Sequence, residues 1–196
     1  ALYENSTAND NSAFGHKALW KNTTGAHNVG VGNSALQANT TANANTAVGY
    51  LAAASNTTGS ANCAFGKDAL YTNSTGSNNT SIGQGSLYYN TASDNTAVGR
   101  NALAANTTGT PNTAVGYDAL TANTTGINNT AVGRRALYTN TTAEANVAIG
   151  VNALATNNGS YNTAVGTGCL EANTTGTRNT AMGYVALDAN TTGSYN

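Results

Sequence analysis

Charge, proline, cysteine and long apolar runs are all scarce in this chain of 196 residues. Only 8% of the residues are charged, 7 of them Lys or Arg and 8 of them Asp or Glu, for a net charge of −1. No run of about 18 apolar residues is present, so no membrane-spanning helix is expected. The chain also lacks the charged-then-apolar start of a signal peptide. We therefore expect no nucleic-acid partner and no membrane insertion by this segment.

What the chain has instead is one phrase repeated from end to end. "NTAVGYDALTANTTGIN" at 112–128 is followed at once by "NTAVGRRALYTNTTAEA" at 129–145. The glycine that closes the first five letters recurs eleven times, at a constant step of seventeen except for two steps of sixteen. Both short steps lack one residue of the T-T pair, at 90–94 and 157–161, so this pair is expected in a turn. Such a fixed period is the signature of stacked repeats.

The repeat predicts an all-β fold, a parallel β-solenoid (β-roll) with one coil per repeat of the phrase. We number the slots of a coil from one to seventeen, starting at the Asn of N-T-A-V-G, which is expected to be the strand. Residues 1–196 form a single array of about 11.5 coils, a rod of roughly 55 Å at about 4.8 Å per coil. Slots six to eleven fit either a short helical turn, ended by the slot-twelve Asn in the αL conformation, or a second short strand. The chain opens and stops within the repeat, so we expect a fragment of a longer fibrous protein.

Slots two and four share one face of the strand because side chains alternate. Slot four is always apolar, and slot two accepts Val29, Cys63 and Val147. We therefore predict that this face points inward, and that the small residue at slot three points outward against a close neighbour. Burial of two large apolar side chains per coil stabilises the fold by less than the backbone entropy lost when a whole coil is ordered. Side-by-side association of identical chains is therefore expected.

Three polar slots are constant along the chain. Gly at slot five suggests a positive φ or a close backbone approach. Asn at slots one and twelve tolerates turn conformations and can stack into an amide ladder. In two central repeats, the predicted structural ladder comprises Asn112, Gly116, Asn123, Asn129, Gly133 and Asn140.

Residues that carry chemistry are few and scattered. Cys63 and Cys169 lie about six coils apart, roughly 29 Å, whereas a disulfide needs Cα atoms within about 7 Å. We therefore expect no disulfide between them, and we expect both to be small side chains buried in the core. No motif for a metal or a phosphate is present, so we expect no enzyme activity, no metal and no cofactor. The N-T-T triplets, as at Asn106 and Asn123, match the glycosylation pattern. Asn90 and Asn157 keep the Asn without that pattern, which favours a structural role.

Aromatic residues at slot ten are the candidates for surface contact with sugar or protein, or for packing against a neighbouring chain. They are Tyr3, Trp20, Tyr71, Tyr88 and Tyr138. An ice-binding face of stacked Thr is a further alternative. It requires an unbroken outward row, and the slot-two row is broken by three other residues.

The phrases "NTAVG", "NVAIG" (146–150) and "NTSIG" (79–83) resemble the N-S-V-A-I-G phrases of trimeric autotransporter adhesin heads, the YadA-like left-handed β-roll. The fuller phrase "NTAVGYDALTANTTG" is similar to repeats of bacterial surface proteins and phage-type tail-fibre proteins. The resemblance covers essentially the whole chain and implies a homotrimer whose slot-four residues fill each roll. The T-T-G segment departs from it, because those heads use a shorter coil.

These observations predict a non-enzymatic structural or adhesive segment of an extracellular fibre or surface adhesin, on a cell surface or a virion fibre. The expected partners are further copies of the chain, most simply as a trimer, and a host or prey cell surface, glycan or protein. The alternative is a monomeric β-solenoid that binds ice or glycans through an exposed face.

Overall fold

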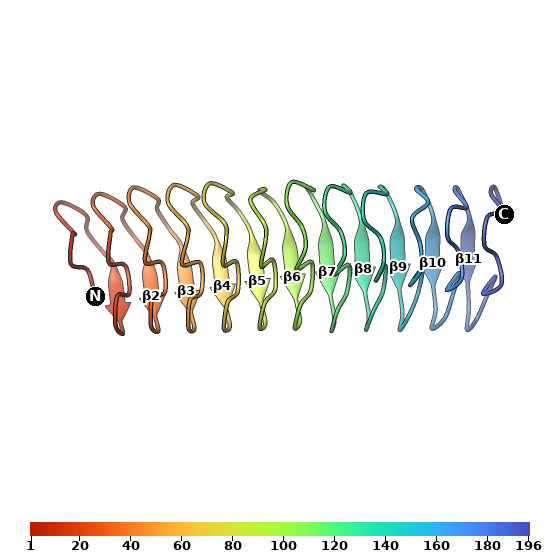
Figure 1. Ribbon diagram of the computed structural model, residues 1–196, viewed down its shortest axis with the longest axis horizontal. Helices are drawn as coiled ribbons and strands as arrows, with labels where there is room; N and C mark the ends of the chain where they lie inside the picture. The colour runs from red at the N-terminus through yellow and green to blue at the C-terminus, as the bar shows by residue number, and fades with distance from the viewer.

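The computed structural model describes residues 1–196 as a straight rod with the two termini at opposite ends (Figure 1). One parallel sheet runs along the rod in the order β1 to β11, one strand per coil. This confirms the predicted all-β parallel solenoid with one coil per repeat. The chain contains no helix that is long and apolar enough to cross a membrane. The strands are β1 Ser12–Phe14, β2 Val29–Val31, β3 Thr46–Val48, β4 Cys63–Phe65, β5 Thr80–Ile82, β6 Thr96–Val98, β7 Thr113–Val115, β8 Thr130–Val132, β9 Val147–Ile149, β10 Thr163–Val165 and β11 Thr180–Met182.

Equivalent slots lie directly over one another along the sheet. Val115 pairs with Val132 across β7 and β8. The two short coils keep this register, since Thr80 of β5 pairs with Thr96 of β6 across the first of them. The missing residue is therefore absorbed entirely in the turn, which leaves every strand in phase.

The core lies between the strands and the returning half of each coil. Slot-three alanines such as Ala114 and slot-nine leucines such as Leu120 are fully buried. The prediction that slots two and four face inward and slot three outward is wrong: within the array, Phe65 and Ile149 at slot four are 54% and 41% exposed, whereas Ala64 and Ala148 at slot three are buried. The interior is narrow, because a Cβ built on Gly30 at slot three meets Leu19 Cγ at 3.2 Å. The leucine fills the roll, and the strand can contribute nothing larger than a small residue.

Slots six to eleven form neither a helical turn nor a second strand. They form a run of turns in which slots seven and nine have positive φ, as at Asp118 (54°) and Leu120 (51°). Leu120 N donates to Ala136 O in the next coil at 2.9 Å, whereas Ala119 N donates to Gly116 O in its own coil at 3.3 Å. A helical turn keeps these bonds within one coil, but the alternation directs every second N–H along the rod. The Asn at slot twelve is not the αL residue.

The slot-five glycines hold adjacent coils close together. Gly116 has φ of 135°, and a Cβ built on it lies 2.6 Å from Gly133 O. That separation is shorter than any van der Waals contact, so the slot excludes every side chain. The positive φ predicted for this slot is present in all eleven of these glycines.

Two columns of buried asparagine run the length of the rod. At slot one, Asn112 Oδ1 accepts from Asn129 N at 3.0 Å. At slot twelve, Asn123 Nδ2 donates to Asn106 Oδ1 at 2.9 Å, and Asn140 Nδ2 donates to Asn123 Oδ1 at 3.1 Å. These amides satisfy one another and the turn carbonyls in a core that apolar groups alone are too few to fill.

The slot-twelve ladder is interrupted at each short coil. Asn73 Oδ1 and Asn140 Oδ1 are buried and accept no hydrogen bond. Each precedes a coil that lacks its slot-fourteen residue, and the Asn of that coil bonds within its own turn instead, as Asn90 Nδ2 does to Ala92 O at 2.7 Å. The shortened turn therefore preserves strand register at the cost of one amide bond.

Candidate interaction surface

The largest distinctive surface of the rod is the outward side of the sheet, which we call the outer face. It consists of the slot-two and slot-four side chains of β1 to β11, and none of them is charged. Slot four contributes only large apolar groups, which are exposed or half-buried. They are Phe14, Val31, Val48, Phe65, Ile82, Val98, Val115, Val132, Ile149, Val165 and Met182.

The outer face is long and narrow. Ten steps of about 4.8 Å and a width of three residues give about 50 Å by about 10 Å, a strip of about 500 Å² in all. It combines the apolar slot-four row with a slot-two row that is mostly Thr. The molecule has no pocket. Whatever this face recognises therefore meets it as an extended surface.

Two charged margins flank the outer face. The entry edge comprises slots sixteen and seventeen, immediately before each strand; the exit edge comprises slots six and seven, immediately after it. The turns that enter and leave the strands lie at opposite margins of the sheet (Figure 1). The exit edge carries five basic residues against two acidic ones, for a net charge of +3. The entry edge carries three acidic residues against Arg178, for a net charge of −2 with His27 neutral.

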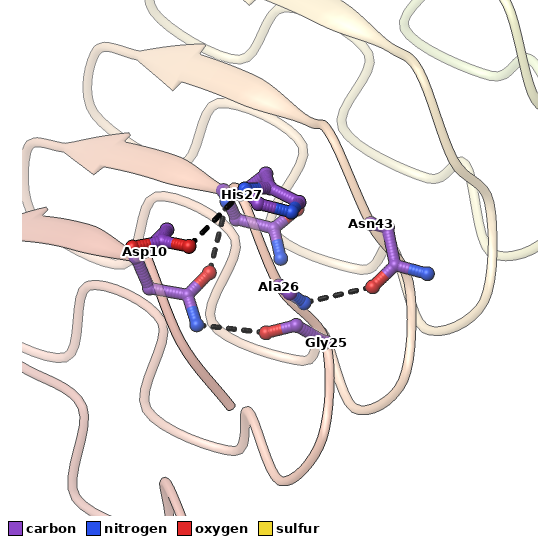
Figure 2. A network of polar contacts seen from close by, with 7 residues as sticks. Asp10, Gly25, Ala26, His27 and Asn43 are labelled. Carbon is purple, nitrogen blue, oxygen red and sulfur yellow. Dashed lines mark hydrogen bonds and ion pairs between the residues drawn. The ribbon is translucent and has the colours of Figure 1, made fainter. Parts of the chain in front are cut away.

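Polar contacts tie the entry edge of one coil to the next, as Figure 2 shows near the N-terminus. Ala26 N donates to Asn43 Oδ1 at 2.7 Å, which joins neighbouring turns. Asp10 Oδ2 lies 3.7 Å from His27 Nδ1, with both side chains about two-thirds or more exposed (73% and 67%). An exposed pair of this kind contributes little to stability.

The slot-ten aromatic residues lie on the wall opposite the outer face. Tyr3 and Trp20 stack with ring centroids 4.4 Å apart, and Tyr71 and Tyr88 stack at 5.1 Å. Burial raises the pKa of Tyr88, and the charge of the neighbouring Tyr71 raises it further. Tyr138 lies beneath the guanidinium of Arg135, with its ring centroid 5.0 Å from Cζ.

The aromatic residues form no continuous column, because Gln, Ala and Thr occupy slot ten in several coils between them. The structure brings together two of the predicted contact pairs but no aromatic strip along the rod. The outer face is the more extensive surface.

Burial determines how accessible the cysteines and the glycosylation motifs are. Cys169 is buried, and burial raises the pKa of its thiol. Cys63 is only half-buried and lies on the outer face, so the expectation of a buried filler is wrong for this residue. Asn106 and Asn123 are fully buried, with Nδ2 hydrogen-bonded in the ladder. Neither amide is accessible to a glycan in the folded rod.

Sequence reasoning placed the slot-four residues in the core and so missed the outer face. A usable signal was present in their variation. Slot four alternates between Val, Ile, Phe and Met, which differ widely in volume, whereas slot nine is almost always Leu. A close-packed interior does not accept such changes in volume at one position from coil to coil.

The structure brings together no group of three or more His, Cys, Asp or Glu side chains that could hold a metal ion. Comparison with protein-family models, with curated proteins and with solved structures finds no match to this chain.

Proposed function

We propose that this chain is a structural and adhesive segment of an extracellular fibre, in which identical rods associate side by side through the outer face. One observation carries the proposal: an uncharged, largely apolar face runs without interruption over all eleven strands. Large exposed apolar patches of this kind mark sites of protein interaction. A rod whose length grows by whole coils also suits a shaft.

The number of chains and the setting rest on the resemblance to trimeric autotransporter heads and tail-fibre repeats. We propose three rods around a common axis, with the outer faces turned toward it, on a cell surface or a virion fibre. The slot-four residues then fill a shared core between chains rather than the interior of each roll. The slot-ten aromatic residues, on the opposite wall, remain outside to meet a host or prey cell surface, a glycan or a protein.

Charge placed on the outer face tests this association. In Val115→Glu, a carboxylate replaces a half-buried methyl pair at the centre of the face, so we expect a monomer with an unchanged circular dichroism spectrum. Sedimentation equilibrium or native mass spectrometry measures the mass. Thr108→Glu is the matched control, because Thr108 is exposed on the turn outside the outer face and its variant should still associate. A wild-type chain that stays monomeric at tens of micromolar contradicts the proposal.

A second candidate function, binding to ice, is favoured by one feature of the same face. The Thr residues of slot two lie on the outer face, beside the row of apolar slot-four side chains, as an ice-binding array requires. Val29, Cys63 and Val147 still interrupt the row. Thermal hysteresis of the purified rod measures this activity directly. The fibre proposal predicts none, and hysteresis that Thr113→Lys abolishes would establish the second function.

A further inference from the structure

We infer that the exit edge binds a linear acidic polysaccharide that carries one negative charge per disaccharide. The binding surface is a column of exposed slot-six side chains on successive coils, after β3 to β8 (Figure 1), which we call the slot-six column. It consists of Tyr50, Lys67, Gln84, Arg100, Tyr117 and Arg134. The column lies outside the outer face and does not include the aromatic residues of slot ten. The inference therefore goes beyond the proposed association of rods and does not depend on it.

Backbone hydrogen bonds between coils fix the spacing of the slot-six column. The carbonyl of each slot-six residue accepts a hydrogen bond from the slot-seven N–H of the next coil. Tyr50 O accepts from Asp68 N at 2.9 Å, and Arg100 O accepts from Asp118 N at 3.0 Å. The side chains therefore project at a constant step of about 4.8 Å. Because the backbone is already ordered, a ligand that matches this step binds without the cost of ordering a loop.

The cations of the slot-six column occupy alternate coils. Lys67, Arg100 and Arg134 follow β4, β6 and β8, and all three side chains are exposed. Consecutive cations are therefore two coil steps apart, about 10 Å. One pyranose ring with its glycosidic oxygen is nearly as long as one coil step. A chain with one carboxylate or sulfate per disaccharide consequently presents one negative charge to each cation of the column.

No acidic residue occupies slot six in any of the eleven coils. The acids of the exit edge lie at slot seven. Asp68 Oδ2 lies 3.7 Å from Lys67 Nζ, and the Asp68 side chain is 20% exposed against 58% for the lysine. Asp118 is buried and accepts from Asn101 Nδ2 at 3.1 Å. With Arg135 at slot seven, these six coils carry four basic and two acidic residues at the exit edge, so the net charge is +2 even with both acids counted in full.

Tyrosine rings position two of the cations without neutralising them. Arg100 Cζ lies 5.6 Å from the ring centroid of Tyr117, and its Nη1 donates to Tyr117 Oη at 3.5 Å. Lys67 Nζ lies 6.0 Å from the ring centroid of Tyr50. Contacts of this kind at exposed sites are weak, so the positive charge remains available to an anion. Tyr50 and Tyr117 are themselves 51% and 41% exposed, and their rings and hydroxyls can contact the C–H groups and hydroxyls of a sugar.

Two other kinds of polyanion match the slot-six column less well. A nucleic-acid strand in a duplex carries one phosphate per about 3.4 Å, about three for each cation of the column. An extended chain of glutamate carries one carboxylate per about 3.3 Å, with successive side chains on opposite sides. Both leave most of their charges without a partner on the column. The sparse cations therefore favour the equally sparse charge of an acidic polysaccharide.

Calorimetric titration of the full chain with defined oligomers tests the inference. The probe is a hexasaccharide of alternating glucuronic acid and N-acetylglucosamine, and the matched neutral probe is a hexasaccharide of N-acetylglucosamine. The acidic hexasaccharide should bind about ten-fold or more tightly than the neutral one at low salt. Equal affinities, or no binding of either, overturn the inference. Tighter binding of triglutamate or of a tetranucleotide with three phosphates, which carry a similar charge, also overturns it.

Removal of charge locates the site on the rod. Arg100→Gln combined with Arg134→Gln should raise the dissociation constant of the acidic hexasaccharide about ten-fold or more. Arg178→Gln is the matched control, because Arg178 is also exposed and lies 5.2 Å from the ring centroid of Tyr161, but on the entry edge. Its change should be less than about two-fold. Equal losses in the two variants overturn the assignment to the slot-six column.

The oligomeric state separates this inference from the proposed function. A rod that stays monomeric and still binds the acidic hexasaccharide supports the inference and contradicts the proposed association. A rod that associates but binds the acidic and neutral hexasaccharides equally overturns the inference alone.

Discussion

Gly116→Ala should lower the free energy of unfolding by about 3–5 kcal/mol. Gly116 has φ of 135°, a region that L side chains rarely adopt. Its new methyl carbon also lies 2.6 Å from Gly133 O, a backbone atom of the next coil. The clash is relieved only if the two coils separate, and separation breaks the bond from Gly133 N to Val115 O (2.8 Å). Urea unfolding measures the loss, and hydrogen exchange should localise it to β7 and β8.

The matched control is Gly168→Asn. Gly168 also has positive φ, 65°, but the nearest atom to a Cβ is Glu171 Oε2 at 3.3 Å, the end of a flexible side chain. Asn tolerates this left-handed conformation, and Asn101 and Asn152 occupy the same slot in other coils. Gly168→Asn should change the free energy of unfolding by no more than about 0.5 kcal/mol. Equal losses at both glycines would show that the contact between coils is not the cause.

Asn123→Ala is expected to cost about 2–5 kcal/mol, because it leaves several buried polar groups unpaired at once. Asn123 Nδ2 donates to Asn106 Oδ1 at 2.9 Å and to Gly126 O at 3.1 Å. Its Oδ1 accepts from Asn140 Nδ2 at 3.1 Å. Alanine supplies none of these bonds, and water has no access to the fully buried site. The measurement is the free energy of unfolding in urea.

Two further asparagines serve as controls for the ladder. Asn73→Ala should cost less than Asn123→Ala, because Asn73 Oδ1 already has no partner at the short coil. Asn33→Ala, at an exposed slot-six position, should change stability by no more than about 0.5 kcal/mol. If all three variants lost the same stability, the amide ladder would not be what holds the coils together.

The sequence by itself determined the period, the stacking and the constant positions. Identical residues at a constant spacing predicted that Val115 lies over Val132, because stacked coils place equivalent slots in register. The two residues do pair across β7 and β8. The invariance of Gly116 pointed to a backbone position closed to side chains. The loss of a residue at 90–94 and at 157–161 located the turn. These features are local or strictly periodic, so one repeat contains the information for all of them.

Only the tertiary structure decided which side of the strand is the inside. Alternation shows that Thr113 and Val115 share a face, but it does not say whether that face is buried. The opposite wall decides, because Leu120 fills the narrow interior and leaves room only for small residues such as Ala114. The turn conformation of slots six to eleven and the pairing of charged side chains along the two margins depend on the same closure of the coil. They arise between neighbouring coils, at distances that the order of residues within one coil does not specify.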